Sequence, residues 1–277
     1  MKLSPNRPSF LRMMNCFSVM ILALFFLFPL YWIVTGSIKD AAAINSKVPQ
    51  WFPENPTLDN YVRLFEQPAL QWLGNTIFMA FVAMLLTCIT ASLAGYVLAK
   101  KRFYGRRPLF VMLVCAMALP KQVIVIPLLR EMDALGLHDN IWAVILPTVG
   151  WPFGIFLMKQ FSETIPREML EAAKVDGSGE MRTFLQIAFP VIRPGVGALA
   201  IFTFVTAWND YFLQLIMLME RDQLTISLGI AKLQSEMASD FGLIMSGACL
   251  AALPIILIFI LFQRYFTQGI TLGSVKG

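Results

Sequence analysis

Charged side chains are scarce in this sequence. Asp, Glu, Lys and Arg make up 14% of its 277 residues, whereas an average soluble domain carries about 25%. Hydrophobic residues make up 57%. A soluble surface cannot be covered with so few charges, so we expect most of the chain to lie in a lipid bilayer.

Metal-binding side chains are also few. The one histidine, His138, lies in a predicted outer loop, and the four cysteines lie far apart without CxxC spacing. A zinc site would need several such ligands close together. We therefore expect no metal site, and we expect inert packing roles for the cysteines, which are Cys16, Cys88, Cys115 and Cys249.

Catalytic signatures are missing as well. No HExxH motif and no paired aspartates occur in the apolar runs, and no GxxxxGK[ST] phosphate-binding loop occurs anywhere. No soluble domain carries a basic stripe interleaved with aromatic residues, which excludes nucleic-acid binding. We expect no catalytic residues, and the chain cannot itself hydrolyse ATP.

Long apolar runs dominate what is present. A helix needs about 20 mainly apolar residues to cross a bilayer. Six runs meet this length, so we predict an all-α, polytopic membrane protein, with the whole chain, 1–277, as a single transmembrane domain. The predicted spans are residues 15–36, 72–99, 109–129, 141–158, 195–219 and 241–262.

The first apolar run has an alternative reading as a cleavable signal peptide, because Lys2, Arg7 and Arg12 precede it. The run is too long for that and lacks a small-residue cleavage pattern. We expect it to be a retained first helix.

Lys and Arg are distributed unevenly between the two faces. The N-terminal tail, residues 100–107, residues 159–193 and the C-terminal tail hold 15 of the 22. The positive-inside rule makes that face cytoplasmic. Both termini are then cytoplasmic, and the net charge of +5 reflects topology.

The loop over 161–194 is the one large cytoplasmic segment. Pro166 suits the first turn of a helix, Gly177 can end it in the left-handed conformation, and Ser178 is a suitable N-cap for a second helix. Met181, Phe184, Leu185 and Ala188 recur at helical spacing and predict one apolar stripe. The segment therefore predicts a helix-turn-helix docking surface, with Met169, Ala172 and Ala173 on one side of its first helix.

The loop sequence EAAKVDGSGEMRTFLQIAFPVIRP resembles the EAA loop of permease subunits in binding-protein-dependent ABC importers. In that family the loop is a coupling helix that docks in a cleft of the ATPase. The resemblance places seven residues in this contact, namely Glu171, Ala172, Ala173, Asp176, Gly177, Phe184 and Pro190.

The resemblance covers nearly the whole chain and is closest to the sugar-importer branch, the maltose-type smaller permeases. It implies an ABC ATPase dimer that carries ATP and Mg, a second, non-identical permease and an extracytoplasmic solute-binding protein, with no cofactor on this chain. It also implies a bacterial or archaeal plasma membrane. The tail residues Gly273, Lys276 and Gly277 would make a second ATPase contact, with a frayed terminus as the alternative.

Two ionisable residues lie inside predicted spans, Lys121 and Asp210. Such residues are costly in lipid and mark functional sites by default. They either pair or line a pathway, or Lys121 reaches outward to water and Asp210 bonds to Asn209. Trp208 and Asn209 beside Asp210 could instead offer a ring face and hydrogen bonds to a sugar.

Three other functions remain open at this point. A glycerol-3-phosphate importer permease would suit the same branch. An ion-coupled secondary transporter commonly has several membrane carboxylates and internal repeats, whereas only Asp210 is found in the predicted spans. An intramembrane hydrolase would need the catalytic groups that are missing.

Overall fold

The computed structural model describes residues 9–236 and 240–274, with side chains described from 13 to 236 and from 240 to 260. These residues form helices and loops without a strand, which confirms the all-α prediction. The long helices are α1 (Ser9–Ser37), α4 (Ala69–Lys100), α11 (Phe189–Asn209) and α14 (Phe241–Ser274). The shorter ones are α2 (Ala41–Ile44), α3 (Asp59–Glu66), α5 (Arg106–Met117), α6 (Lys121–Ala134), α7 (Trp142–Val149), α8 (Phe153–Glu163), α9 (Arg167–Val175), α10 (Glu180–Thr183), α12 (Tyr211–Met217) and α13 (Ile226–Glu236), with a π-helical turn at Phe184–Ala188 and a 3₁₀ turn at Arg221–Gln223.

Five helical stretches within the described residues are long and apolar enough to cross a membrane by themselves. A sixth span results if α5 and α6 are counted together, although the two are bent by 107° relative to each other. The five stretches are Met13–Ser37, Ala69–Lys100, Trp142–Glu163, Glu180–Asn209 and Phe241–Ile260.

Three predicted spans differ from the observed helices, and of these the fourth, 141–158, is interrupted between α7 and α8 at residues 150–152. The third, 109–129, is not one straight helix, because α5 ends at Met117 and α6 starts only after Pro120. The fifth, 195–219, begins too late and ends too late. Pro190 directly follows the π turn at Phe184–Ala188 in a helical stretch that runs from Glu180 to Asn209, so the helix continues through it and ends before Asp210.

The chain divides into two compact units. Unit 1 comprises residues 1–67 and 230–252. Within it, the buried Asn60 donates to the carbonyl oxygens of Ser37 and Lys39 at 3.0 and 2.8 Å, and Arg63 forms an ion pair with Asp240. Lys39 is itself buried, and the loss of hydration lowers the pKa of its amino group.

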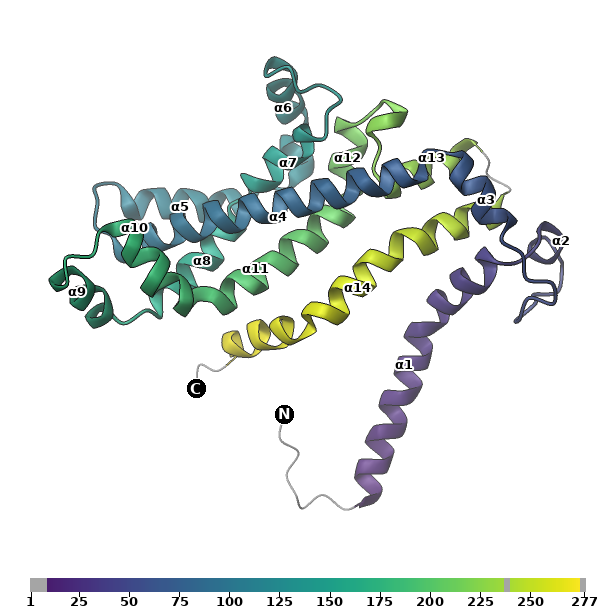
Figure 1. Ribbon diagram of the computed structural model, residues 1–277, viewed down its shortest axis with the longest axis horizontal. Coiled ribbons are helices and arrows are strands. Elements are labelled where there is room, and N and C mark those ends of the chain that lie inside the picture. The colour runs from purple at the N-terminus through teal and green to yellow at the C-terminus, as the bar shows by residue number, and fades with distance from the viewer. Residues whose placement is uncertain (1–8, 237–239, 275–277) are drawn as a thin grey trace. The chain divides into compact units, whose positions relative to one another are not determined.

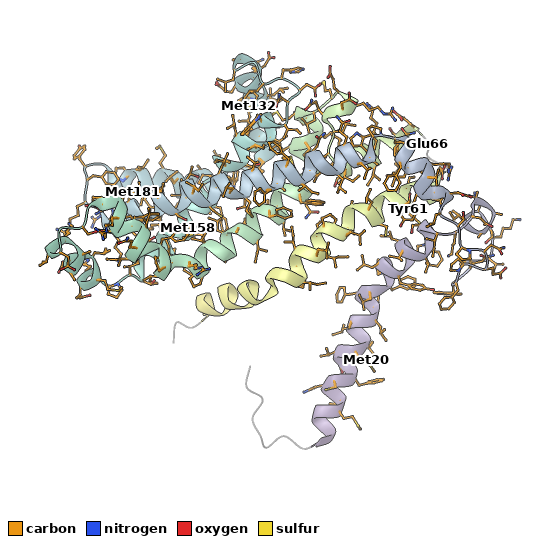
Figure 2. All side chains as sticks on the ribbon, viewed as in Figure 1. Met20, Tyr61, Glu66, Met132, Met158 and Met181 are labelled. Carbon is orange, nitrogen blue, oxygen red and sulfur yellow. The ribbon has the colours of Figure 1, made fainter. Side chains whose placement is uncertain are left out.

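Unit 2 comprises residues 68–229 and 253–277, and its core lies where α4, α8 and α11 pack together (Figure 1). A Cβ atom added at Gly95 of α4 would lie 2.6 Å from the backbone nitrogen of Lys159 in α8. Met158 is fully buried among these helices (Figure 2). The absence of a side chain at Gly95 thus allows close helix approach, as small residues do in membrane proteins.

Within unit 2, α9 and α10 lie at one end of these helices, whereas α6, α7 and α12 lie toward the other (Figure 1). Three breaks mark that second end. They separate α5 from α6, α7 from α8, and α11 from α12. The two ends therefore differ in construction, and each carries one of the sites described next.

Candidate functional site

The first candidate site begins at the end of α9. The φ angle of Gly177 is 73°, the left-handed conformation that the sequence predicted. The N–H of Gly177 bonds to the carbonyl of Lys174, and the N–H of Ser178 bonds to the carbonyl of Ala173, at 3.0 and 2.9 Å. This pair of bonds is a Schellman motif. It turns the chain sharply toward α10 and fixes the direction of that turn.

The two sides of α9 have different surroundings. Ala173 is 4% exposed, and Leu170 packs against the core cluster that contains Met158 and Phe184. Glu171 and Ala172 are exposed. One side of α9 therefore packs against the core of unit 2, and the other side is exposed.

The second helix of the loop differs in detail from the prediction. Gly179, not Ser178, is the N-cap of α10, and the Ser178 hydroxyl instead accepts from that of Thr183 at 3.2 Å. The predicted single apolar stripe is split. Phe184 and Ala188 are buried, whereas Met181 and Leu185 are 61% and 55% exposed. The helix continues as a π turn from Phe184. One of its faces packs against the core, and the other is exposed.

Phe184 anchors this segment. Its ring lies 5.2 Å from that of Tyr96 in α4 and 6.2 Å from that of Phe189, measured between centroids. Aromatic pairs at such distances add to the stability gained from burial. Phe184 therefore positions the loop from inside rather than presenting its own side chain at the outer surface.

Basic residues at the end of α4 fasten the same loop. The amino group of Lys100 donates to the carbonyl oxygens of Glu163 and Ile165, at 3.1 and 2.7 Å. Lys101 forms an ion pair with Glu180. Two of the basic segments that the charge count assigned to one face, 100–107 and 159–193, thus lie at the same end of unit 2.

The outward side of the loop combines exposed apolar and acidic residues. Val175 is 88% exposed and Met169 is 41% exposed. Exposed apolar groups of this kind mark interaction surfaces. We call this surface the docking face, and it consists of Met169, Glu171, Ala172, Val175, Met181 and Leu185.

The other predicted coupling residues flank this face. Asp176 is exposed at the C-cap of α9, and Pro190 is exposed near the start of α11. Of the predicted tail contact, Gly273 lies near the end of α14, whereas Lys276 and Gly277 lie outside the described residues. That contact stays a prediction.

The second candidate site lies at the three helix breaks, and each break contributes one residue. Lys121 is the first residue of α6, Trp151 lies between α7 and α8, and Asp210 is the N-cap of α12. The Lys121 amino group is 2.7 Å from an Asp210 carboxylate oxygen and 5.3 Å from the centre of the Trp151 ring. We call these three residues the break cluster.

The Asp210 carboxylate also accepts a bond from the N–H of Leu213 at 3.3 Å, so the same group caps α12 and pairs with Lys121. Its side chain is 12% exposed, and that of Lys121 is 34% exposed. A half-buried carboxylate needs such partners, because an unpaired charge in this setting would be costly.

The two neighbours of Asp210 lie apart from this cluster. Trp208 is 1% exposed and stacks on Phe204 at 5.6 Å. The Asn209 amide donates to the carbonyl of Val205 at 2.8 Å. Trp208 thus fills the core of the unit, and the aromatic ring near the ion pair belongs to Trp151, which the sequence analysis missed. Its position between Gly150 and Pro152, two helix-ending residues, was the available signal.

An outer loop carries a further set of contacts. The Asp139 carboxylate accepts from the backbone N–H groups of Met219 and Glu220 at 2.7 and 2.9 Å, and it ties two outer turns of unit 2 together. His138 lies 3.7 Å from Asp133. The structure reveals no group of three metal-ligating side chains within the range it describes.

Comparison with known proteins gives a consistent picture. Residues 91–272 match the family described as binding-protein-dependent transport system inner membrane component. The chain is 32% identical to the arabinooligosaccharides transport system permease protein AraQ of Bacillus subtilis (strain 168), over 93% of each chain. It is 35% identical to the lactose transport system permease protein LacG of Rhizobium radiobacter, over 94% of this chain and 95% of that protein.

Solved structures agree on the fold. A chain from a bacterial ABC transporter involved in the import of the acidic polysaccharide alginate is similar with a TM-score of 0.83. The similarity covers 95% of this chain and 100% of that chain, at 22% sequence identity. At this identity the likeness establishes the fold alone.

Proposed function

Since the chain belongs to the family of binding-protein-dependent transport system inner membrane components, we propose that it is the permease subunit of an ATP-driven sugar importer. Family membership makes it a multi-pass protein of the inner membrane. The relatives named above are permeases for arabinooligosaccharides and for lactose. An oligosaccharide is therefore the favoured cargo.

The docking face is the observation that carries this proposal. Its exposed apolar residues lie at the end of unit 2 where the basic residues gather, outside the apolar middle of the spans. Lipid tails do not cover such a position, whereas a protein cleft would. Because Ala172 has a small side chain, a partner can approach the α9 backbone closely, with Met169 and Val175 as apolar contacts around it.

The partner that we assign to this face is an ABC ATPase dimer, which would hold ATP and Mg. The positive-inside rule then places the docking face and both termini in the cytoplasm. A second, non-identical permease would complete the pathway, and a solute-binding protein would deliver the cargo from outside.

Transport would follow from how firmly α9 is attached. ATP binding closes the ATPase dimer and displaces α9. Because Leu170, Ala173 and Phe184 fix the loop to α4 and α8, the displacement passes into these helices. The spans then repack, and the pathway opens toward the loaded binding protein.

Affinity purification of the chain in mild detergent tests the proposal. We expect a P-loop ATPase and a second permease to co-purify, and we expect ATP hydrolysis to rise when a sugar-loaded binding protein is added. Recovery of the chain alone, with solute or ion flux after reconstitution, would contradict the proposal and favour a self-sufficient carrier.

A further inference from the structure

Two residues of the break cluster, Lys121 and Trp151, lie between two cavities of very different size in unit 2. The larger cavity has a volume of about 530 Å³, and the smaller has a volume of about 30 Å³. Both are lined by the same three residues, Lys121, Thr148 and Trp151. These three residues therefore form a partition between the larger and the smaller cavity.

The larger cavity is mostly apolar, and Lys121 is the one charged residue among those that line it. Its volume is within the range of small-molecule sites, roughly 300–1,000 Å³. The polar groups that line it gather at the partition. A molecule in this chamber would thus meet an apolar wall along its sides and hydrogen-bonding groups at one end.

The smaller cavity is too small for a sugar ring, since a volume of this order holds about one or two waters. Hydroxyl groups surround it nonetheless, from Thr87, Thr148, Thr203 and Thr206. The Thr87 side chain is 4% exposed, and its hydroxyl oxygen has no hydrogen-bond partner among the described residues. A buried polar atom without a partner costs free energy. A ligand hydroxyl that bonded to this oxygen would remove that cost and so favour binding.

We propose that the break cluster binds one sugar ring of the cargo during transport. The Trp151 ring supplies the flat face on which the apolar side of a sugar ring can stack. The Lys121 amino group, which lines both cavities, donates to sugar hydroxyls, and the Asp210 carboxylate paired with it accepts from them once the pair opens. Both are charge-assisted hydrogen bonds. The ligand class is a neutral oligosaccharide, and this assignment rests on the proposed function.

Because the cluster lies at three helix breaks, movement of the helix halves at these breaks could open the partition. Helix halves can tilt at a break with little loss of backbone bonding, and discontinuous helices of this kind form the substrate sites of other membrane transporters. While the Lys121–Asp210 pair is closed, it holds two of the three breaks together. Sugar hydroxyls that replace the bonds of this pair release the partition, and the threonines behind it become accessible.

Cysteine protection tests the proposal in the purified complex. Cys16, Cys88, Cys115 and Cys249 are first replaced by alanine, and Thr148→Cys is introduced at the partition. The rate of its reaction with N-ethylmaleimide is then measured with ATP present, once with the cargo-loaded binding protein and once with the unloaded one. The cargo is the sugar that the wild-type complex takes up from a panel of labelled lactose, raffinose and arabinotriose.

We expect the loaded binding protein to slow the reaction at Thr148→Cys at least about fivefold. The control Ser235→Cys, at an exposed residue of α13 that lines neither cavity, should react equally in both arms. Adding Trp151→Ala should abolish the protection, and Trp151→Phe should preserve it. Equal rates at Thr148→Cys, in a complex that transports the cargo, would overturn the proposal.

Uptake kinetics give an independent readout. We expect Trp151→Ala to raise the KM for cargo about tenfold, which corresponds to about 1.4 kcal/mol, and Trp151→Phe to change it less than about threefold. A lower maximal rate at unchanged KM for both variants would mean a structural role and would overturn the binding site. A wild-type complex that takes up no sugar, and whose ATPase no loaded binding protein stimulates, would overturn the proposed function itself.

Discussion

The two ends of unit 2 are built in opposite ways. At the docking end, α9 is held by buried side chains, by a Schellman turn and by the lysines that end α4. At the other end, three helices are broken, and a cavity of about 530 Å³ lies beside a single ion pair. The first end is a continuous packed attachment, and the second is interrupted at three breaks beside a cavity.

This difference suits the two tasks that a driven permease must combine. A surface that receives force from a motor should not deform, because deformation would absorb the movement. A partition that admits cargo must rearrange, and rearrangement costs least at breaks where the backbone is already interrupted. We infer that the docking end transmits movement and that the break cluster responds to it.

The largest expected effect lies on the outer side of the docking end. Glu171→Lys should abolish uptake and ATPase co-purification while leaving the permease in the membrane, because a misplaced positive charge would enter the docking contact. Glu131→Lys, the same change on the exposed side of α6, serves as the control and should leave ATPase co-purification unchanged. Normal uptake by Glu171→Lys would show that α9 does not dock on the ATPase.

Two adjacent residues, Phe184 and Leu185, distinguish the side chains that fasten the loop to the core from those of the docking face. Phe184→Ala removes a buried ring and should lower stability by about 3–5 kcal/mol, seen as a lower Tm of the complex in detergent. Leu185→Ala, at a side chain that is 55% exposed, should leave the Tm nearly unchanged and reduce the amount of ATPase that co-purifies. If Leu185→Ala lowered the Tm as much as Phe184→Ala, the assignment of the two faces would be wrong.

Two glycines of α4 test how rigid the packing is. Gly95→Ala places a methyl group 2.6 Å from the α8 backbone and should cost about 1–3 kcal/mol through overpacking. At Gly74, nothing lies within 4 Å of an added Cβ atom, so Gly74→Ala should be neutral or stabilise the helix by up to about 1 kcal/mol. Thermal unfolding of both variants measures the difference. Equal Tm values would mean that the packing between α4 and α8 adjusts to the added methyl group.

The smallest effect concerns the ion pair between Lys101 and Glu180. Because the Glu180 side chain is 67% exposed, water screens the interaction, and exposed pairs contribute about 1 kcal/mol or less. A double-mutant cycle with Lys101→Gln and Glu180→Gln, read by thermal unfolding at low and high salt, should give a coupling in that range. A coupling of several kcal/mol would make this pair a principal fastening of the loop.

Much of this fold could be predicted from the sequence, because a bilayer imposes simple demands. Length and apolar composition were enough to find the first, second and sixth spans. The left-handed conformation at Gly177 could be predicted because glycine has no side chain to oppose it. Charge counts grouped two loops that the structure brings to one end of unit 2. These features depend on local composition, which a single sequence records well.

The errors arose where tertiary packing overrides local signals. The fifth span was predicted to begin only at residue 195, yet the helix runs through Pro190 and Pro194 from the π turn onward. Periodicity placed Phe184 and Leu185 on one stripe, whereas the core takes the first and leaves the second exposed. Trp151 joins Lys121 and Asp210 only because three distant breaks meet, and no spacing within the sequence indicates such a meeting.

Hydrogen exchange measured on the assembled complex, with and without ATP, tests the contrast between the two ends most directly. Exchange reports local opening of backbone hydrogen bonds. The account predicts that ATP changes exchange at the three breaks, residues 117–121, 150–152 and 209–213, while the interior of the docking end, residues 180–192, keeps its protection. Altered exchange through 180–192 with unchanged breaks would contradict it.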